Sequence, residues 1–414
     1  MTYDPILNGM ELNRRERRFG WEGALALVVL VLISTLISLE QMNFPSADFA
    51  AHARIASEFD FTDLHSITSR IAYPLWHLLV RTIQYLGVPL GEAATAVTAF
   101  FRGGTYLLTY WLLDAMSEGQ ARRWLVALIA FIANMVTCIW IPEISEFIYK
   151  NVGSPNVWHN PTQQTVQMAM MMVMPWLAHC WYAFERMLSE GKERVMLPWW
   201  KVLVLGVLGM GSCACKPTFM QALLPAAFVM YLVEVVRHPR EWRYFGQIIL
   251  GFLPAVGYFL LQYLYYTGVV VEHTSGVEVG IVWFSTNYYT RNCLMMTAAP
   301  LLAMLACWKK GMFKNRMLVL SLLMLVFSVL EAAAFRETGQ RYGHGNFTWA
   351  LNTSAFFYWA VVSGIFLRTF PQQLQKGLAW WRKILYGASA AFLLWHVYSG
   401  AAYIWILLFE NRAF

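Results

Sequence analysis

Apolar runs of about 20 residues recur along this 414-residue chain, separated by short clusters of charge. A helix needs about 20 mostly apolar residues to cross a bilayer. Charged residues make up only 13% of the chain. That is about half the share in soluble domains, so too few remain to cover a soluble surface. The pattern predicts an all-α polytopic membrane protein, with residues 1–414 forming a single transmembrane domain and no separate soluble domain.

The predicted topology has eleven transmembrane helices, with the N-terminus inside and the C-terminus outside. Their expected ranges are 23–39, 93–115, 124–142, 164–187, two halves of 202–236, 244–266, 293–307, 317–335, 349–367 and 384–408. As one helix, the 35 residues of Val202–Val236 would be about 52 Å long, against a hydrocarbon core of about 30 Å. Lys216-Pro217 interrupts this run and predicts a hairpin with Lys216 at its outer turn. The 293–307 segment carries Pro300 and is expected to be tilted or broken.

The distribution of Lys and Arg decides the orientation. Tyr73–Leu86 places His77 and Arg81 on one helix face, a pattern typical of a helix lying in the interface. If this segment does not cross, 21 of the 31 basic residues lie on the N-terminal side; if it crosses, 17 of those 21 lie outside. The positive-inside rule favours the first arrangement. We therefore expect residues 1–21 to be cytoplasmic and residues 40–92 to form a periplasmic loop with interfacial helices, in a protein of the inner (plasma) membrane.

Several classes of function find no support. The net charge of +7 comes from short, scattered basic clusters that orientation explains, so we expect no nucleic-acid partner. Six cysteines in a chain of this length are no disulfide framework. The sequence has no P-loop, dinucleotide-binding glycine motif, His-Glu-x-x-His or Gly-x-Ser-x-Gly motif.

The expected outer loops, 40–92, 143–163, 267–292 and 336–348, are long and polar, which places the working site on the outer face. Asp48 and His52 lie four residues apart on one helix face in the first of them. Asp48 is interpreted either as an acid at a helix start or as a general base with His52 as its neighbour.

The second outer loop holds two further candidates. Glu143 and Glu146 are either a solvated helix end or acids that support the site, with a partial metal site left open. The Trp158-His159-Asn160 cluster is rich in donors and suits contacts with a sugar, and its alternative is an ordinary polar helix entrance.

Basic residues at the outer face oppose the charge rule and need a reason. Lys216 either contacts a lipid-linked phosphate or extends to the outer headgroups. The glycine-rich 336–348 loop holds Arg336, Glu337, Arg341 and His344, and guanidinium groups match phosphate oxygens well. Arg70 is a weaker instance of the same pattern. We list the expected substrate-binding residues as Lys216, Arg341, Arg336, Arg70, His159, Asn160, Trp158, His344, Glu337 and His52.

The layout resembles the GT-C superfamily of integral-membrane glycosyltransferases. The resemblance lies in Asp48 after the first helix, Tyr73-Pro74-Leu75 in an interfacial helix, Phe101-Arg102-Gly103-Gly104 opening the second span, Arg122-Arg123 after it, and the acids Glu143 and Glu146. It covers most of the chain as topology. The chain departs from the family pattern in lacking a DxD motif at Asp48, a Pro-Pro pair at Pro74 and a C-terminal soluble domain.

The resemblance implies an inverting transfer on the periplasmic side. A polyprenyl-phosphate-linked sugar would be the donor, a cell-envelope glycan or lipid the acceptor, and Asp48 the catalytic base. Outer basic residues would hold the phosphate, and no cofactor is obligatory, although a divalent cation stays open. The alternatives are a polysaccharide polymerase or ligase that uses a lipid diphosphate-linked glycan, and a lipid or sugar transporter.

Overall fold

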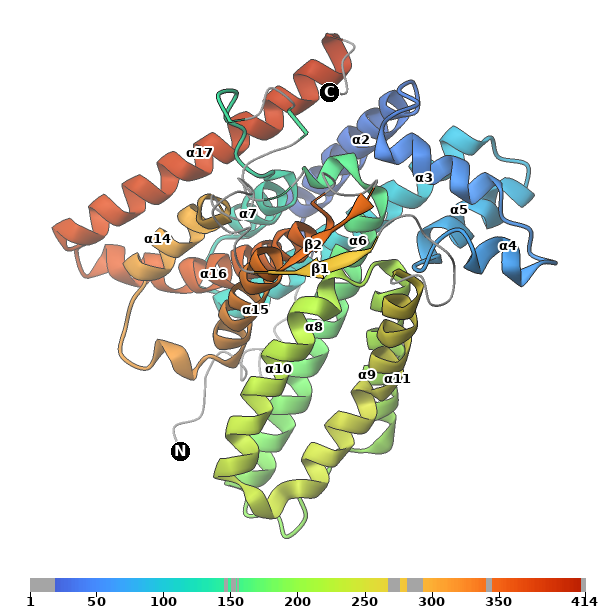
Figure 1. Ribbon diagram of the computed structural model, residues 1–414. Coiled ribbons are helices and arrows are strands. Elements are labelled where there is room, and N and C mark those ends of the chain that lie inside the picture. Colours follow the sequence, from blue (N-terminus) through green and yellow to red (C-terminus); the bar gives the residue numbers. More distant parts are fainter. Residues whose placement is uncertain are drawn as a thin grey trace.

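The computed structural model describes residues 19–144, 148, 149, 154, 156–266, 276–280, 293–339 and 345–410. In this part of the chain, regular structure is almost entirely helical, and six helices are long and apolar enough to cross a membrane. These six are α2 (Trp21–Gln41), α10 (Thr218–Arg237), α11 (Trp242–Tyr266), α15 (Arg316–Ala334), α16 (Trp349–Gln375) and α17 (Trp380–Phe409). The prediction of an all-α, membrane-embedded protein is confirmed (Figure 1).

The other helices are more polar or shorter. Two of them, α6 (Leu90–Ser117) and α8 (Pro161–Ser189), are each about 42 Å long at 1.5 Å per residue. The shorter ones are α3 (Asp48–Ser57), α4 (Leu64–Thr68), α5 (Leu75–Tyr85), α7 (Arg123–Met135), α9 (Trp199–Cys215) and α14 (Ala298–Ala306). Single 3-10 turns are η1 (Val157–His159), η2 (Pro239–Glu241), η3 (Cys293–Thr297), η4 (Met312–Lys314) and η6 (Asn346–Thr348).

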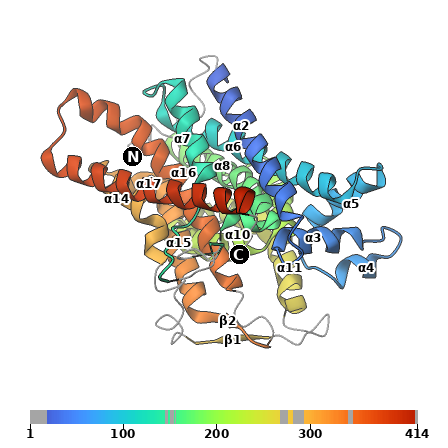
Figure 2. The same cartoon turned by 90° about the horizontal axis from the view of Figure 1, so that it is seen from above.

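Helix α16 forms the centre of the molecule. Within the most apolar stretch of each helix, 89% of α16 is buried, against 28% for α2 and α17. It packs against α6, α8, α10 and α15. Figure 1 shows α8 to α11 as a group of long helices, and Figure 2 shows α3 to α5 projecting together on one side of the molecule. Polar side chains on the helices around α16 are therefore shielded from lipid.

The predicted hairpin within 202–236 is present. Helix α9 ends at Cys215, and Lys216 has an extended backbone with φ −173° and ψ 139°. Pro217 begins the turn into α10, because a proline ring excludes the helical conformation for the residue before it and supplies no N–H.

Two predicted spans are shorter in the structure. Helix α7 ends at Met135 rather than continuing to 142. Side chains of α17 bond the backbone beyond it: the His396 ring bonds the Thr137 carbonyl at 2.6 Å, and Ser399 accepts from the Trp140 N–H at 3.0 Å. Non-helical backbone is tolerated at membrane depth where protein satisfies it in this way. The 293–307 segment is broken, as expected, into η3 and the nine residues of α14.

The expected first outer loop folds as short helices. Helix α5 has eleven residues and is about 16 Å long, too short to cross the bilayer, in agreement with the interfacial interpretation of Tyr73–Leu86. A small antiparallel pair that the sequence did not indicate joins β1 (Val277–Val279) to β2 (Phe335–Glu337), with Glu278 opposite Arg336. This pair connects two of the expected outer loops.

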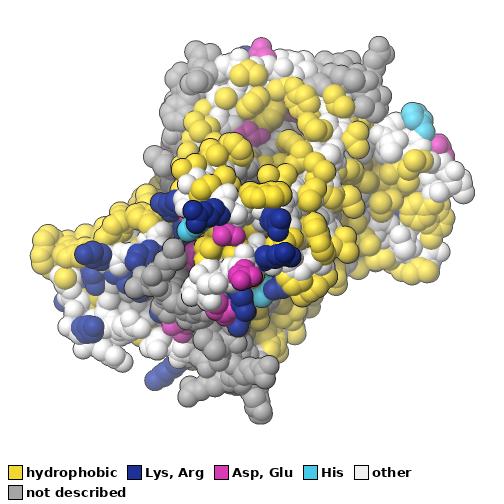
Figure 3. Space-filling view, turned by 90° about the horizontal axis from the view of Figure 1, so that it is seen from below, with side chains coloured by type: hydrophobic (Ala, Val, Ile, Leu, Met, Phe, Trp, Pro, Cys, Tyr) yellow, Lys and Arg dark blue, Asp and Glu magenta, His cyan; other side chains and the backbone are white. Residues whose placement is uncertain are grey.

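The two ends of the long helices differ in charge. Asn160 and Lys216 lie at one end of α8, α9 and α10, while Arg186, Lys201 and Arg237 lie at the other. Figure 3 shows Lys and Arg side chains gathered on the face seen from below. The polar cluster described next is thus at the opposite end of these helices from the basic clusters.

Candidate functional site

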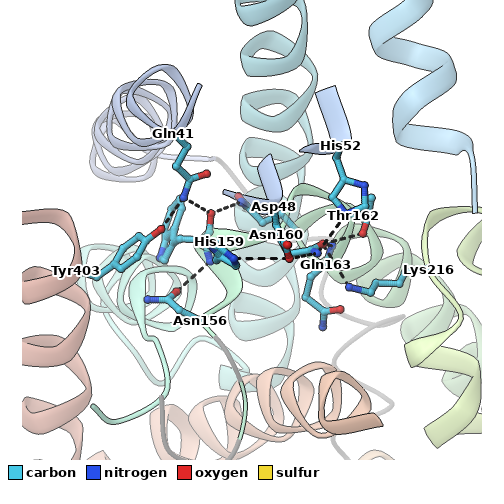
Figure 4. A network of polar contacts seen from close by, with 12 residues as sticks. Gln41, Asp48, His52, Asn156, His159, Asn160, Thr162, Gln163, Lys216 and Tyr403 are labelled. Atoms are coloured by element: carbon cyan, nitrogen blue, oxygen red, sulfur yellow. Dashed lines mark hydrogen bonds and ion pairs between the residues drawn. The ribbon is translucent and has the colours of Figure 1, made fainter. Parts of the chain in front are cut away.

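Three separate segments bring polar side chains together at one end of α8. Asp48 and His52 lie one turn apart on α3, Asn160 caps the N-terminus of α8, and Lys216 occupies the turn between α9 and α10. Figure 4 shows these side chains pointing toward one another. Segments separated by 112 and 56 residues in the sequence therefore form one site.

Asn160 connects the members of this site. Its Nδ2 group donates to Asp48 Oδ2 at 3.0 Å and lies 3.4 Å from His52 Nε2. Its Oδ1 atom accepts from Thr162 Oγ1 at 2.7 Å, from the Gln163 backbone N–H at 3.0 Å and from Lys216 Nζ at 3.3 Å. One carboxamide thus faces a carboxylate with its N–H groups and a lysine with its oxygen.

Asp48 is the carboxylate of the site. Its side chain is 45% exposed, and His159 Nε2 lies 3.8 Å from Oδ2. Burial of the carboxyl opposes ionisation, but the electrostatic interactions with His159, His52 and Lys216 and the hydrogen bond from Asn160 outweigh it, so the pKa of Asp48 lies below its usual value. Asp48 is therefore an accessible anion at neutral pH, which a proton acceptor requires.

The three histidines of this region, two beside Asp48 and His77 behind His52, have a different role. His52, His77 and His159 are buried, and burial lowers the pKa of each, for His52 to about 4. The Tyr149 ring stacks on His159 with centroids 4.7 Å apart. At neutral pH these rings are neutral, so they act as hydrogen-bonding groups.

Lys216 is buried, with 5% of the residue exposed. Its ammonium group lies 4.4 Å from the centre of the Trp349 ring, which favours a cation over an aromatic face. Burial lowers the pKa of Lys216 to about 7, against the opposing influence of the Asp48 and Glu337 carboxylates. An anionic ligand beside Lys216 would restore its full charge.

A cavity of about 520 Å³ opens beside Lys216. Its polar lining is Lys216, Thr218, Gln221, Gln262, Glu331, Glu337 and Asn346. Its apolar lining comes mainly from α10, α11 and α15, and includes Met220, Leu224, Phe259, Phe327 and Leu330. Asp48 does not line this cavity and is linked to it through Asn160 and Lys216. The cavity therefore has a charged side chain, Lys216, at one end and mainly apolar side chains along its walls.

Helices from other parts of the chain fix the turn that carries His159 and Asn160. Gln41 Nε2 on α2 donates to the Trp158 carbonyl at 2.9 Å and to Tyr403 Oη on α17 at 2.6 Å. The Arg102 guanidinium on α6 lies 4.2 Å from the centre of the Trp158 ring and donates to Gln167 Oε1 at 2.7 Å. The turn is thus held by α2 and α6, with Tyr403 on α17 fixing the Gln41 side chain.

The structure gathers seven of the predicted site residues and separates others. Asp48, His52, His159, Asn160 and Lys216 lie together, Trp158 precedes His159 in the same turn, and Glu337 lines the cavity. Trp158 is placed differently from the expected sugar contact: it is 1% exposed because Arg102 covers its ring.

Two predicted arginines have other partners. Arg70 pairs with Glu58, and both side chains are exposed. Arg336 Nε donates to Glu278 Oε1 across the β1–β2 pair at 2.8 Å, and Arg336 does not line the cavity. The sequence showed neither partner, because each pairing depends on tertiary structure.

Of the two acids in the expected second outer loop, only Glu143 lies among the described residues. Glu143 is exposed, and within the described ranges no group of three or more His, Cys, Asp or Glu side chains is arranged to hold a metal ion. Glu146, Arg341 and His344 lie outside the described residues.

Sequence reasoning did not place Gln41 or Trp349 in the site; it named Arg102 only within the family resemblance and Gln163 only as part of the polar segment that follows His159. Gln41 ends α2, Gln163 lies in the first turn of α8 and Trp349 begins α16. The available signal for Gln41, Arg102 and Gln163 was the cost of a buried Arg or Gln in a membrane. Comparison with protein-family models finds no match, and no curated protein sequence matches the chain. The site is interpreted from its own geometry.

Proposed function

We propose that the protein is an inverting glycosyltransferase. It would move a sugar from a polyprenyl-phosphate-linked donor to a cell-envelope glycan or lipid acceptor, at the periplasmic face of the inner membrane. The observation that carries this proposal is the joining of an accessible carboxylate, Asp48, to a buried lysine, Lys216, through Asn160 beside a partly apolar cavity.

The donor fits the two ends of the cavity. Lys216 is a cation beside its polar end, and it supports binding of one phosphodiester charge. The walls from α10, α11 and α15 suit an isoprenoid chain. Of the described residues lining this cavity, Lys216 is the only Lys or Arg, which favours a monophosphate-linked donor over a diphosphate-linked one.

The chemical step needs a base and a leaving-group cation. In our scheme the acceptor hydroxyl gives its proton to Asp48 while its oxygen attacks the anomeric carbon. The bond between that carbon and the phosphate oxygen breaks, and the electron pair passes to the phosphate, whose charge Lys216 stabilises. The products are the glycoside and polyprenyl phosphate, and Asp48 returns its proton to water.

The charge asymmetry supports the proposed side of the membrane. The basic clusters lie at the opposite end of α8, α9 and α10 from the site. Under the positive-inside rule, the clusters face the cytoplasm and the site faces outward.

The test is the transfer of labelled sugar from a polyprenyl-phosphate donor in membranes. Asp48→Asn keeps the size of the side chain and removes its basicity, so we expect a loss of at least about 100-fold. Asp63→Asn in the same loop is the matched control, because asparagine caps α4 as aspartate does and should retain activity. Undiminished transfer by a well-expressed Asp48→Asn protein would remove Asp48 from this role. Donor flux into liposomes without any covalent product would instead indicate a transporter.

A further inference from the structure

A hydrogen-bonded pair of histidines lies behind the proposed base, at the contact between α3 and α5. His52 Nδ1 and His77 Nε2 are 2.9 Å apart, and both residues are buried. Aromatic rings surround the pair: Trp76 lies 6.4 Å from His52 and 5.2 Å from His77 between centroids, and Phe59 lies 5.8 Å from His77. Among these aromatic rings, His52 Nδ1 and His77 Nε2 are hydrogen-bonded to each other.

The direction of every hydrogen bond in this group follows from Asn160. Its Oδ1 atom is met by the Gln163 backbone N–H, which can only donate, and by the Thr162 hydroxyl and the Lys216 ammonium group. The other amide atom is therefore nitrogen. Its two hydrogens have two acceptors, Asp48 Oδ2 at 3.0 Å and His52 Nε2 at 3.4 Å.

This order determines the tautomers of both histidines. Because His52 Nε2 accepts from Asn160, a neutral His52 carries its proton on Nδ1 and donates it to His77 Nε2. His77 Nε2 is then an acceptor, so the His77 proton lies on Nδ1. The hydrogen bonds thus form one continuous series, from His77 on α5 through His52 on α3 and Asn160 at the start of α8 to the Asp48 carboxylate.

We infer that His77 is a positioning residue: its Nε2 acceptor holds His52 as the Nδ1–H tautomer and, through Asn160, orients the Asp48 carboxylate. Without this acceptor, His52 Nδ1–H has no partner in an apolar pocket, and the ring gains by moving its proton to Nε2. That proton would face the Asn160 N–H group, and two donors repel. Turning the amide over would in turn aim its N–H groups at Lys216 and the Gln163 N–H.

Burial keeps both rings neutral near pH 7, despite the Asp48 carboxylate near His52. From α3, the turn before α8 and the α9–α10 turn, His52 faces Asp48, His159 and Lys216; His77 faces His52 and the backbone of Tyr73. Burial is the largest influence and lowers both pKa values, for His52 to about 4. This arrangement of hydrogen bonds should therefore persist throughout the neutral pH range and be lost only at acidic pH.

The first experiment needs no activity. Full-length protein with ¹⁵N-labelled histidine in detergent micelles is studied by NMR, and His52 and His77 are assigned from signals lost in single variants. We expect two neutral Nδ1–H tautomers from pH 8 down to about pH 5. An Nε2–H tautomer or an imidazolium at His52 at pH 7 would overturn the inference.

The second experiment rests on the proposed function and compares two variants of His77. His77→Gln offers an acceptor near the original Nε2 position, whereas His77→Phe fills the space without one. We expect His77→Phe to lower kcat about 10- to 100-fold with little change in KM for the lipid donor, because Lys216 and the cavity are untouched. His77→Gln should recover most of kcat, and the exposed His65→Gln serves as control.

The two experiments separate the two ideas. If the wild-type protein transfers no sugar, the proposed function fails, and NMR still decides the order of the hydrogen bonds. If His77→Gln loses as much kcat as His77→Phe, or if both match wild type, His77 does not act through its acceptor and the inference is wrong.

Discussion

At the residue scale, Asn160 determines how a carboxylate and an ammonium group coexist. A carboxamide is both donor and acceptor, so it stabilises Asp48 and Lys216 without neutralising either. A direct ion pair would lower the reactivity of both groups. The asparagine therefore keeps a base and an anion-binding cation separate.

Replacing Asn160 by Asp tests this role. Two adjacent carboxylates cannot both ionise easily, so the pKa of Asp48 should rise. Since the base acts when deprotonated, the acidic limb of the transfer rate should move to higher pH. Asn315→Asp is the matched control, because Asn315 caps α15 through the same oxygen and lies at a different helix start. An unchanged acidic limb in Asn160→Asp would argue against this coupling.

Lys216 provides a second prediction at this scale. Its pKa of about 7 means that it is charged at pH 6 and largely neutral at pH 8 in the free site. A phosphodiester keeps its single charge over this range, so affinity for the lipid phosphate should fall about tenfold from pH 6 to pH 8. Lys216→Arg stays charged and should remove the pH dependence. Binding of a fluorescent polyprenyl phosphodiester at both pH values is the measurement, and an equal fall in Lys216→Arg would contradict it.

At the element scale, a group of ion pairs joins α8, α10 and α15 away from the site. Arg316 donates to Glu185 at 3.1 Å and pairs with Glu234 at 3.2 Å, and Arg237 also pairs with Glu234 at 3.0 Å. The Glu234 side chain is only 4% exposed. Glu234 is the buried member of this group, so removing its charge takes away the partner that Arg316 and Arg237 share.

Glu234→Gln should therefore destabilise the bundle by about 1–3 kcal/mol. The measurement is thermal unfolding in detergent followed by intrinsic fluorescence. Glu190→Gln is the control, because Glu190 pairs with Arg186 on an exposed helix end and should leave the melting temperature unchanged. Equal melting temperatures for the two variants would mean that these ion pairs do not hold the helices together.

At the scale of the whole molecule, the site and the basic clusters lie at opposite ends of the same helices. This polarity makes a prediction about the cell. Asp63→Cys in the first outer loop should react with an impermeant thiol reagent in intact cells, whereas Glu193→Cys between α8 and α9 should react only after permeabilisation. Five of the six native cysteines, Cys138, Cys180, Cys213, Cys215 and Cys307, are buried, so these five should contribute little background labelling. The reverse pattern of labelling would invert the proposed topology.

Much of the architecture could be deduced from the order of residues. The α9–α10 break at Lys216-Pro217 and the short α5 follow from length limits and local backbone chemistry, which act over a few residues. The end of α7 could not be deduced in this way. It depends on His396 and Ser399, more than 250 residues away, which satisfy backbone groups beyond Met135.

The candidate site, too, could be predicted only in part from the sequence. Asp48, His52, Asn160 and Lys216 were recognisable individually, because charge and polarity are costly beside a membrane and need a reason. Their common geometry, the burial of Trp158 and the partners of Arg70 and Arg336 were decided only by tertiary packing. Hydropathy is a property of each residue wherever it stands in the chain, so a membrane-embedded helical protein can be predicted from its sequence. Hydrogen bonds of about 3 Å depend on which helices meet, and packing decides that.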